Sequence, residues 1–182
     1  MATLSEQTVQ DFINICHWTY EAWITHRILF DDNPNGEELR HSKYGPLLGR
    51  LSNITADYAL LQLAKLHDRA KGKNLTLEYI IENAGWDSAT ASTLRQLHRQ
   101  LDAFYRQIKP ARNKILAHTD LATIQNKQTL GAFQKNADQE YFTVLAQFIS
   151  VVQGSPFVFG AYVRNDARIF VNGLHKLLTV RR

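Results

Sequence analysis

The amino-acid sequence predicts an all-α protein, built as a single-domain bundle of five or six helices. Apolar residues recur at steps of three and four along most of the chain, which is the period of a helix that buries one face. Only four prolines interrupt the 182 residues, and the only candidate for extended chain is the stretch 156–163. We expect one domain over residues 1–182, with its main core at about 10–150 and a C-terminal helix at about 165–180.

The composition is that of an ordinary globular protein, with 45% hydrophobic and 21% charged residues. Cys16 is the only cysteine, which excludes a disulfide framework and a zinc site of the CxxC type. The net charge of +4 permits a phosphate-bearing partner without requiring one. The sequence contains no signal peptide and no window of apolar residues long enough to cross a membrane. We therefore expect a cytoplasmic protein with no membrane partner.

The first helix should run from about Ser5 to Phe30, because its apolar residues form one broad face. Thr3 and Glu6 have the spacing of a capping box at its start. The turn-forming segment DDNPNG at 31–36 should end it sharply.

Two more helices should follow in the first half of the chain. The second should begin within 44–47 and end near Ala70, and its apolar positions follow helical spacing. These positions are Leu47, Leu51, Ile54, Tyr58 and Leu61. A short helix at about 77–83 should stop at Gly85, which suits a helix C-cap.

The next helix should begin after Asp87 or Ser88, either of which is a good N-cap. Its apolar residues alternate steps of three and four, which is the pattern of a seam that packs along a partner helix. The seam consists of Leu94, Leu97, Leu101, Phe104, Ile108, Ala111, Ile115 and His118. Pro110 should cause a kink or a new start, because proline removes a backbone hydrogen bond. Helices at about 137–153 and 165–180 should complete the bundle, after a loop at about 122–136.

The sequence ARNKILAHTD at 111–120 places three polar residues that could take part in catalysis at a helix end. These are Arg112, Asn113 and His118. Six positions separate the arginine from the histidine, so on one straight helix they point about 120° apart and lie roughly 9 Å apart along the axis. They can act on one bond only if the helix unwinds or if a second copy supplies the other half across a two-fold axis.

Positive side chains flank the seam and extend to this segment. They are Arg95, Arg99, Arg106, Lys109, Arg112 and Lys114, with Asp102 interrupting the run. A solvated helix face would explain them. The alternative is a phosphate-lining edge beside the motif, with Arg106 and Lys109 as the candidates for binding phosphate.

The spacing of Arg112 and His118, with Asn113 directly after the arginine, resembles the signature of the HEPN superfamily. The string RNKILAH, followed by Asp120, looks like the form found in its abortive-infection AbiU-like branch. The strings LAKLHD at 63–68 and NLTL at 74–77 resemble the upstream pattern of that branch.

The resemblance implies a HEPN-like helical bundle that dimerises through its motif-bearing helices. Active members are metal-independent endoribonucleases with a composite cleft, and others are toxins of toxin–antitoxin pairs or phage-defence effectors. It also implies RNA as a substrate and an antitoxin or neighbouring-gene product as a partner. Some members carry a tyrosine two residues after the histidine, which a partner enzyme modifies; Asp120 stands there in this chain, which argues against that regulation.

The resemblance and the side-chain chemistry together assign roles. His118 would transfer protons, since its ordinary pKa lies near neutrality. Arg112 would hold the phosphate with its planar fork of donors, and Asn113 would orient the phosphate or the imidazole. Asp120 and Lys114 would support the site, with Asp120 holding one tautomer of the histidine.

Two rival interpretations remain at this point. One is a catalytically silent HEPN-like dimer that binds a nucleotide, RNA or a protein. The other is an all-α scaffold in which Arg112 and His118 are structural, as a histidine at a helix end often is. Elsewhere, we interpret His67 and Asp68 as a helix-end cap and place His98 on the exposed side of its helix. His17 and Glu21 lie one helical turn apart, but spacing supplies no third ligand beside them, so we predict no metal and no cofactor.

Overall fold

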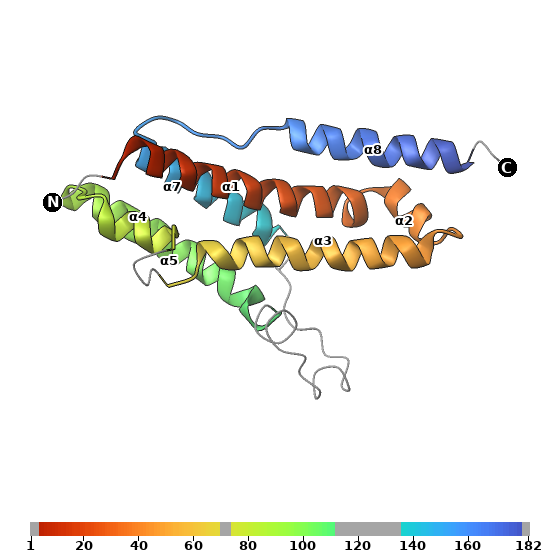
Figure 1. Ribbon diagram of the computed structural model, residues 1–182, viewed down its shortest axis with the longest axis horizontal. Helices are drawn as coiled ribbons and strands as arrows, with labels where there is room; N and C mark the ends of the chain where they lie inside the picture. The colour runs from red at the N-terminus through yellow and green to blue at the C-terminus, as the bar shows by residue number, and fades with distance from the viewer. Residues whose placement is uncertain (1–3, 70–73, 112–135, 180–182) are drawn as a thin grey trace. The chain divides into compact units, whose positions relative to one another are not determined.

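A computed structural model describes residues 4–69, 74–111 and 136–179 of the chain. Within these ranges the protein is all-helical, and the element labels are those of Figure 1. The elements are α1 (Glu6–His26), a π-helical turn η1 (Arg27–Asp31), α2 (Pro34–Arg40), α3 (Gly45–Leu66), α4 (Leu77–Asn83), α5 (Ser88–Ala111), α7 (Ala137–Gln153) and α8 (Tyr162–Thr179). No described helix is both long enough and apolar enough to cross a lipid bilayer.

The predicted count of five or six helices is too low, because the described residues contain seven α-helices. The additional one is α2, which begins inside the segment that we predicted as a break. Asn33 caps it by accepting a hydrogen bond from the backbone N–H of Asn35 at 3.0 Å, and Pro34 occupies the first helical position. The same residue types that end one helix therefore begin the next.

Most of the other helix boundaries agree closely with the sequence patterns, but α1 ends at His26 and α3 at Leu66, about four residues before the predicted ends. Thr76 accepts a hydrogen bond from the backbone N–H of Tyr79 at 3.1 Å, which fixes the start of α4. Asp87 accepts from the backbone N–H groups of Ala89 and Thr90, which fixes the start of α5. Gly154 ends α7 in the left-handed conformation, with φ of 70°. The stretch 156–160 has no regular structure, and α8 begins three residues earlier than predicted.

The described chain forms two compact units. The first unit comprises residues 1–17 and 61–158, and the second comprises 18–60 and 159–182. Helices α1 and α3 each contribute residues to both units. The prediction of one domain over 1–182 stays a prediction.

The first unit is built around the packing of α5 along α7, with α4 against α5. Its core includes the rings of Phe12 and Phe148, whose centroids lie 5.9 Å apart. The predicted seam of α5 is confirmed where it is described: Leu94, Leu97, Leu101 and Ile108 are buried, and Phe104 is half-buried. Pro110 lies inside α5, next to its last described residue, and the predicted restart after it falls outside the described residues, as do Thr3 and the loop 122–135.

The second unit brings η1, α2 and α8 into mutual contact. A cavity of about 490 Å³ lies within this unit, lined almost entirely by apolar side chains. The lining includes Phe30, Leu39, Leu51, Val171 and Leu174.

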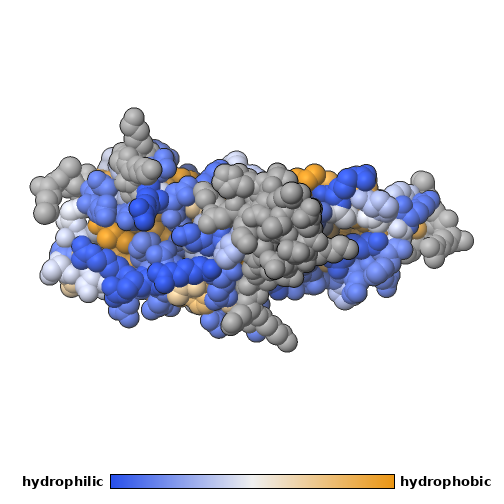
Figure 2. Space-filling model, turned by 90° about the horizontal axis from the view of Figure 1, so that it is seen from below, coloured by the Kyte–Doolittle hydropathy of each residue, from blue (hydrophilic) through white to orange (hydrophobic). Residues whose placement is uncertain are grey.

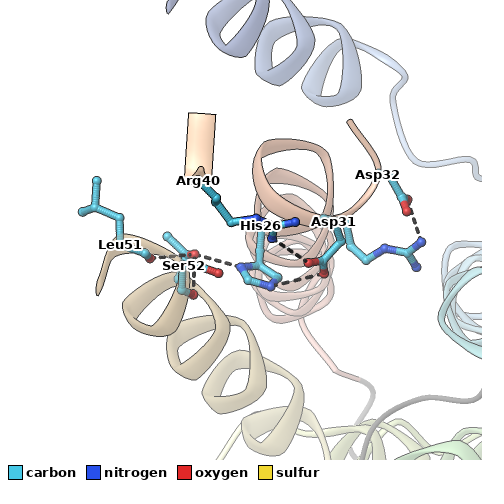
Figure 3. A network of polar contacts seen from close by, with 8 residues as sticks. His26, Asp31, Asp32, Arg40, Leu51 and Ser52 are labelled. Atoms are coloured by element: carbon cyan, nitrogen blue, oxygen red, sulfur yellow. Dashed lines mark hydrogen bonds and ion pairs between the residues drawn. The ribbon is translucent and has the colours of Figure 1, made fainter. Parts of the chain in front are cut away.

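Polar contacts connect four elements of this unit, α1, η1, α2 and α3 (Figure 3). His26 Nδ1 and Thr55 Oγ1 are 2.9 Å apart, and His26 Nε2 lies 3.5 Å from a carboxylate oxygen of Asp31. Arg40 also approaches this carboxylate, at 3.8 Å. The hydrogen bond from His26 and the neighbouring cations hold the pKa of Asp31 below its usual range. The network therefore ties the π-helical turn to α2 and α3.

The apolar row predicted on α3 is exposed. The exposed fractions are 50% for Leu47, 41% for Leu51, 63% for Ile54, 43% for Tyr58 and 41% for Leu61. Their steps of four and three give a continuous apolar stripe along one helix face. Figure 2 shows that hydrophobic patches are exposed among hydrophilic residues on the face drawn there. A stripe of this kind marks a surface that another helix can cover.

Candidate functional site

The predicted catalytic motif follows directly after the last described residue of α5. Arg112, Asn113, Lys114, His118 and Asp120 all lie outside the described residues, so their assigned roles stay predictions.

The two predicted phosphate-binding residues belong to the described part of α5. Arg106 and Lys109 are both exposed, in the last two turns of the helix before Ala111. Helix α5 therefore presents two cations to solvent immediately before the motif. Their exposure agrees with either interpretation, a solvated face or a phosphate-binding edge.

The described residues also contain a buried polar cluster that the sequence did not predict. Its centre is His67, which directly follows the end of α3. The side chain of His67 is only 1% exposed. His67 Nδ1 lies 2.8 Å from Asp102 Oδ1 on α5, and His67 Nε2 lies 3.0 Å from the hydroxyl of Tyr141 on α7. The imidazole also stacks on the ring of Tyr105, with centroids 4.3 Å apart and planes within 6°. His67, at the end of α3, is therefore held by two other helices of the first unit, α5 and α7.

His98 completes this cluster. Its Nε2 lies 3.6 Å from the same carboxylate oxygen of Asp102, one helical turn away on α5. One of our interpretations is therefore wrong, because His67 is not a helix-end cap. His98 is half-buried on α5, with its side chain 22% exposed. A cap would bond its own helix, whereas His67 bonds side chains 35 and 74 positions away.

The hydrogen-bond directions follow from the chemistry of the groups. The carboxylate of Asp102 can only accept, so His67 Nδ1–H donates to it. In the neutral imidazole the other nitrogen accepts, so the hydroxyl of Tyr141 donates to His67 Nε2. Burial lowers the pKa of His67, although Asp102 opposes this effect, and the neutral form is favoured. The hydrogen bond from His67 lowers the pKa of Asp102, and burial raises the pKa of Tyr141 well above its usual value.

The cluster is unsuited to direct attack on a large substrate, because Tyr141 is fully buried and His67 is nearly so. It does fix the end of α3 against α5 and α7. The described residues also contain one group of side chains whose ligand atoms lie close enough together to hold a metal ion: His67, His98 and Asp102.

One sequence signal could have indicated the cluster. His98 and Asp102 are four positions apart, beside the buried seam, which places them on one face of α5. Nothing in the sequence indicates that His67 packs against this pair.

The helical architecture and the sequence motifs define the class: a HEPN-superfamily protein of the AbiU-like branch. A family model described as HEPN_AbiU2: AbiU2 matches residues 3–157, which is most of the chain, and the protein belongs to this family. The match ends before α8 and spans both the buried cluster and the Arg112–His118 motif. Searches of curated proteins and of solved structures each gave no match.

Proposed function

We propose that the protein is a metal-independent endoribonuclease of a phage-defence or toxin–antitoxin system. The observation that carries the proposal is that the family match over 3–157 spans the Arg112–His118 motif. The exposed cations Arg106 and Lys109 support it, because they precede the motif on α5 and suit an RNA backbone.

The proposed reaction is attack of a ribose 2′-hydroxyl on the adjacent phosphorus, with loss of the 5′-oxygen of the next nucleotide. The products are a 2′,3′-cyclic phosphate and a 5′-hydroxyl end. His118 removes the proton from the nucleophile or protonates the leaving oxygen. Arg112 binds the phosphoryl oxygens, on which negative charge accumulates in the transition state. Asn113 orients these groups, and Asp120 and Lys114 support them.

We propose that the active form is a homodimer, since two copies supply two histidines, one for each proton transfer. The exposed apolar stripe of α3 supports association. A two-fold axis would place the same stripe of each copy against the other, so that each covers the other's apolar residues.

The test is cleavage of a mixed RNA pool by the purified protein in the presence of a chelator. Wild type should cut and leave 2′,3′-cyclic phosphate ends, and Arg112→Ala and His118→Ala should each abolish cutting. A matched control is His175→Ala, which removes a histidine that bonds Glu38 within the second unit. Circular dichroism and size-exclusion chromatography should accompany each assay, so that a loss of fold or of dimer is not counted as a loss of chemistry.

The absence of cleavage by a folded, dimeric wild type would refute the proposal and favour the silent HEPN-like dimer that binds a nucleotide, RNA or a protein. Cleavage that survives both motif variants would also refute it, because the activity would then come from another site.

A further inference from the structure

The buried cluster of the first unit has the composition of a metal-binding site. Its three potential ligand atoms are His67 Nδ1, His98 Nε2 and Asp102 Oδ1, and all lie within 4.8 Å of one another. Two of the separations are 2.8 Å and 3.6 Å. Ligands of a tetrahedral zinc ion, with bonds of about 2.0–2.1 Å, are separated by roughly 3.3 Å. The observed separations lie on both sides of this value, so small side-chain movements would suffice to admit an ion.

From this geometry we propose that His67, His98 and Asp102 bind one divalent transition-metal ion of the zinc type. Two imidazoles and one carboxylate are ligands that Zn²⁺ accepts, whereas Mg²⁺ and Ca²⁺ prefer oxygen ligands alone. The sequence prediction of no metal site depended on spacing along one helix. The third ligand, His67, comes from the end of a different helix.

The surroundings of His67 support its use as a ligand. Histidine ligands usually donate their second ring N–H to a neighbouring acceptor, which fixes the ring orientation. In this protein the second nitrogen, Nε2, lies 3.0 Å from the hydroxyl of Tyr141. When the ion takes the place of the Nδ1 proton, the proton moves to Nε2 and is donated to the hydroxyl oxygen. The stacked ring of Tyr105 restrains the imidazole plane in the same orientation.

The two ligands on α5 face solvent, which gives an entry path. The side chains of His98 and Asp102 are 22% and 38% exposed, against 1% for His67. The ion would therefore have three protein ligands on its inner side and a fourth position open to water. Such a site would join the end of α3 to α5, and α5 leads directly to Arg112.

This inference goes beyond the proposed ribonuclease function and does not depend on it. The ion is assigned a structural role and takes no part in the proposed cleavage. Its test uses binding and unfolding, so its failure cannot be confused with the absence of nuclease activity.

The experiment is isothermal titration of the chelator-treated, redialysed full-length protein with ZnCl₂, together with absorption spectroscopy of the Co²⁺ form. Wild type should bind one Zn²⁺ per chain, and Co²⁺ should give the intense visible bands of a tetrahedral site. His98→Ala and Asp102→Asn should weaken Zn²⁺ binding by more than 100-fold, because each removes a ligand. Tyr141→Phe should weaken it by roughly 10- to 100-fold, as loss of a hydrogen-bond partner of a ligand does.

The control is His175→Ala, which removes a histidine 2.6 Å from Glu38 Oε2, outside the cluster. It should leave zinc binding unchanged. Added Zn²⁺ should also raise the unfolding temperature of wild type and His175→Ala, but not of His98→Ala. The proposal is overturned if wild type binds no Zn²⁺, or if His98→Ala and Asp102→Asn remain folded and bind it as tightly as wild type does. Either result would leave the cluster as a hydrogen-bonded core only.

Discussion

Replacing Tyr141 with phenylalanine should destabilise the metal-free protein by about 1–3 kcal/mol. The ring remains, so no cavity forms in this fully buried position. The variant loses only the hydroxyl that donates to His67 Nε2 over 3.0 Å. The net contribution of such a bond is about 1 kcal/mol, and a buried acceptor left without a partner costs about 1–3 kcal/mol. For a chain of this size each kcal/mol lowers Tm by roughly 2–4 °C.

The assay is urea unfolding of chelator-treated protein, followed by circular dichroism. The urea concentration at the unfolding midpoint should fall. The slope of the unfolding free energy against urea concentration should change little, because the surface buried on folding is nearly the same. Tyr79→Phe in α4, a half-buried tyrosine outside the cluster, is the matched control and should change stability less. Equal stability of wild type and Tyr141→Phe would contradict the hydrogen-bond assignment of His67. So would an equal loss in the two variants.

Three further predictions concern stability and reactivity. Asp31→Asn should cost up to about 1 kcal/mol at neutral pH, since the carboxylate is half exposed. The hydrogen bond from His26 lowers the pKa of Asp31 in the folded state, so Asp31 stabilises the protein above the ordinary aspartate pKa, and this stabilisation is lost as pH falls through the folded-state pKa. Urea unfolding at several pH values should show the stability difference between wild type and Asp31→Asn shrinking in acid. A difference that does not change with pH would contradict this. Phe148→Ala should lower the free energy of unfolding by about 3–5 kcal/mol, because the ring is fully buried against Phe12; a loss below about 1 kcal/mol in urea would show that this core is not closely packed. The buried thiol of Cys16, with its raised pKa, should react with a thiol reagent only as fast as the protein opens; immediate labelling of native protein would contradict its burial.

The sequence was sufficient to predict the helices because their boundaries depend on local chemistry. Thr76, Asp87 and Gly154 act within one or two turns of their own helix ends, so their effect can be recognised without knowing the fold. The helix α2 was missed because Asn33 and Pro34 suit both a turn and a helix start. Which of the two forms depends on the residues after Pro34 and on packing against other elements.

The buried cluster could not be predicted for a different reason. His67 meets its partners only after α5 and α7 pack together, and Asp102 and Tyr141 lie far from it in sequence. Without that packing, a histidine at a helix end resembles a cap. The exposure of the α3 stripe could not be predicted from the sequence either. Apolar residues have the same periodicity whether a helix face is covered by the same chain or by another chain.

The division of the chain into two units has a practical consequence for protein engineering. Each unit consists of two separate stretches of chain, and two of the three crossings fall within α1 and α3. No continuous piece of the gene therefore encodes either unit by itself. An expression fragment cut at the end of the family match, residue 157, would lack α8, which lines the apolar cavity of the second unit. Such a fragment should expose aliphatic surface and aggregate, so tags and reporters belong at the ends of the full chain.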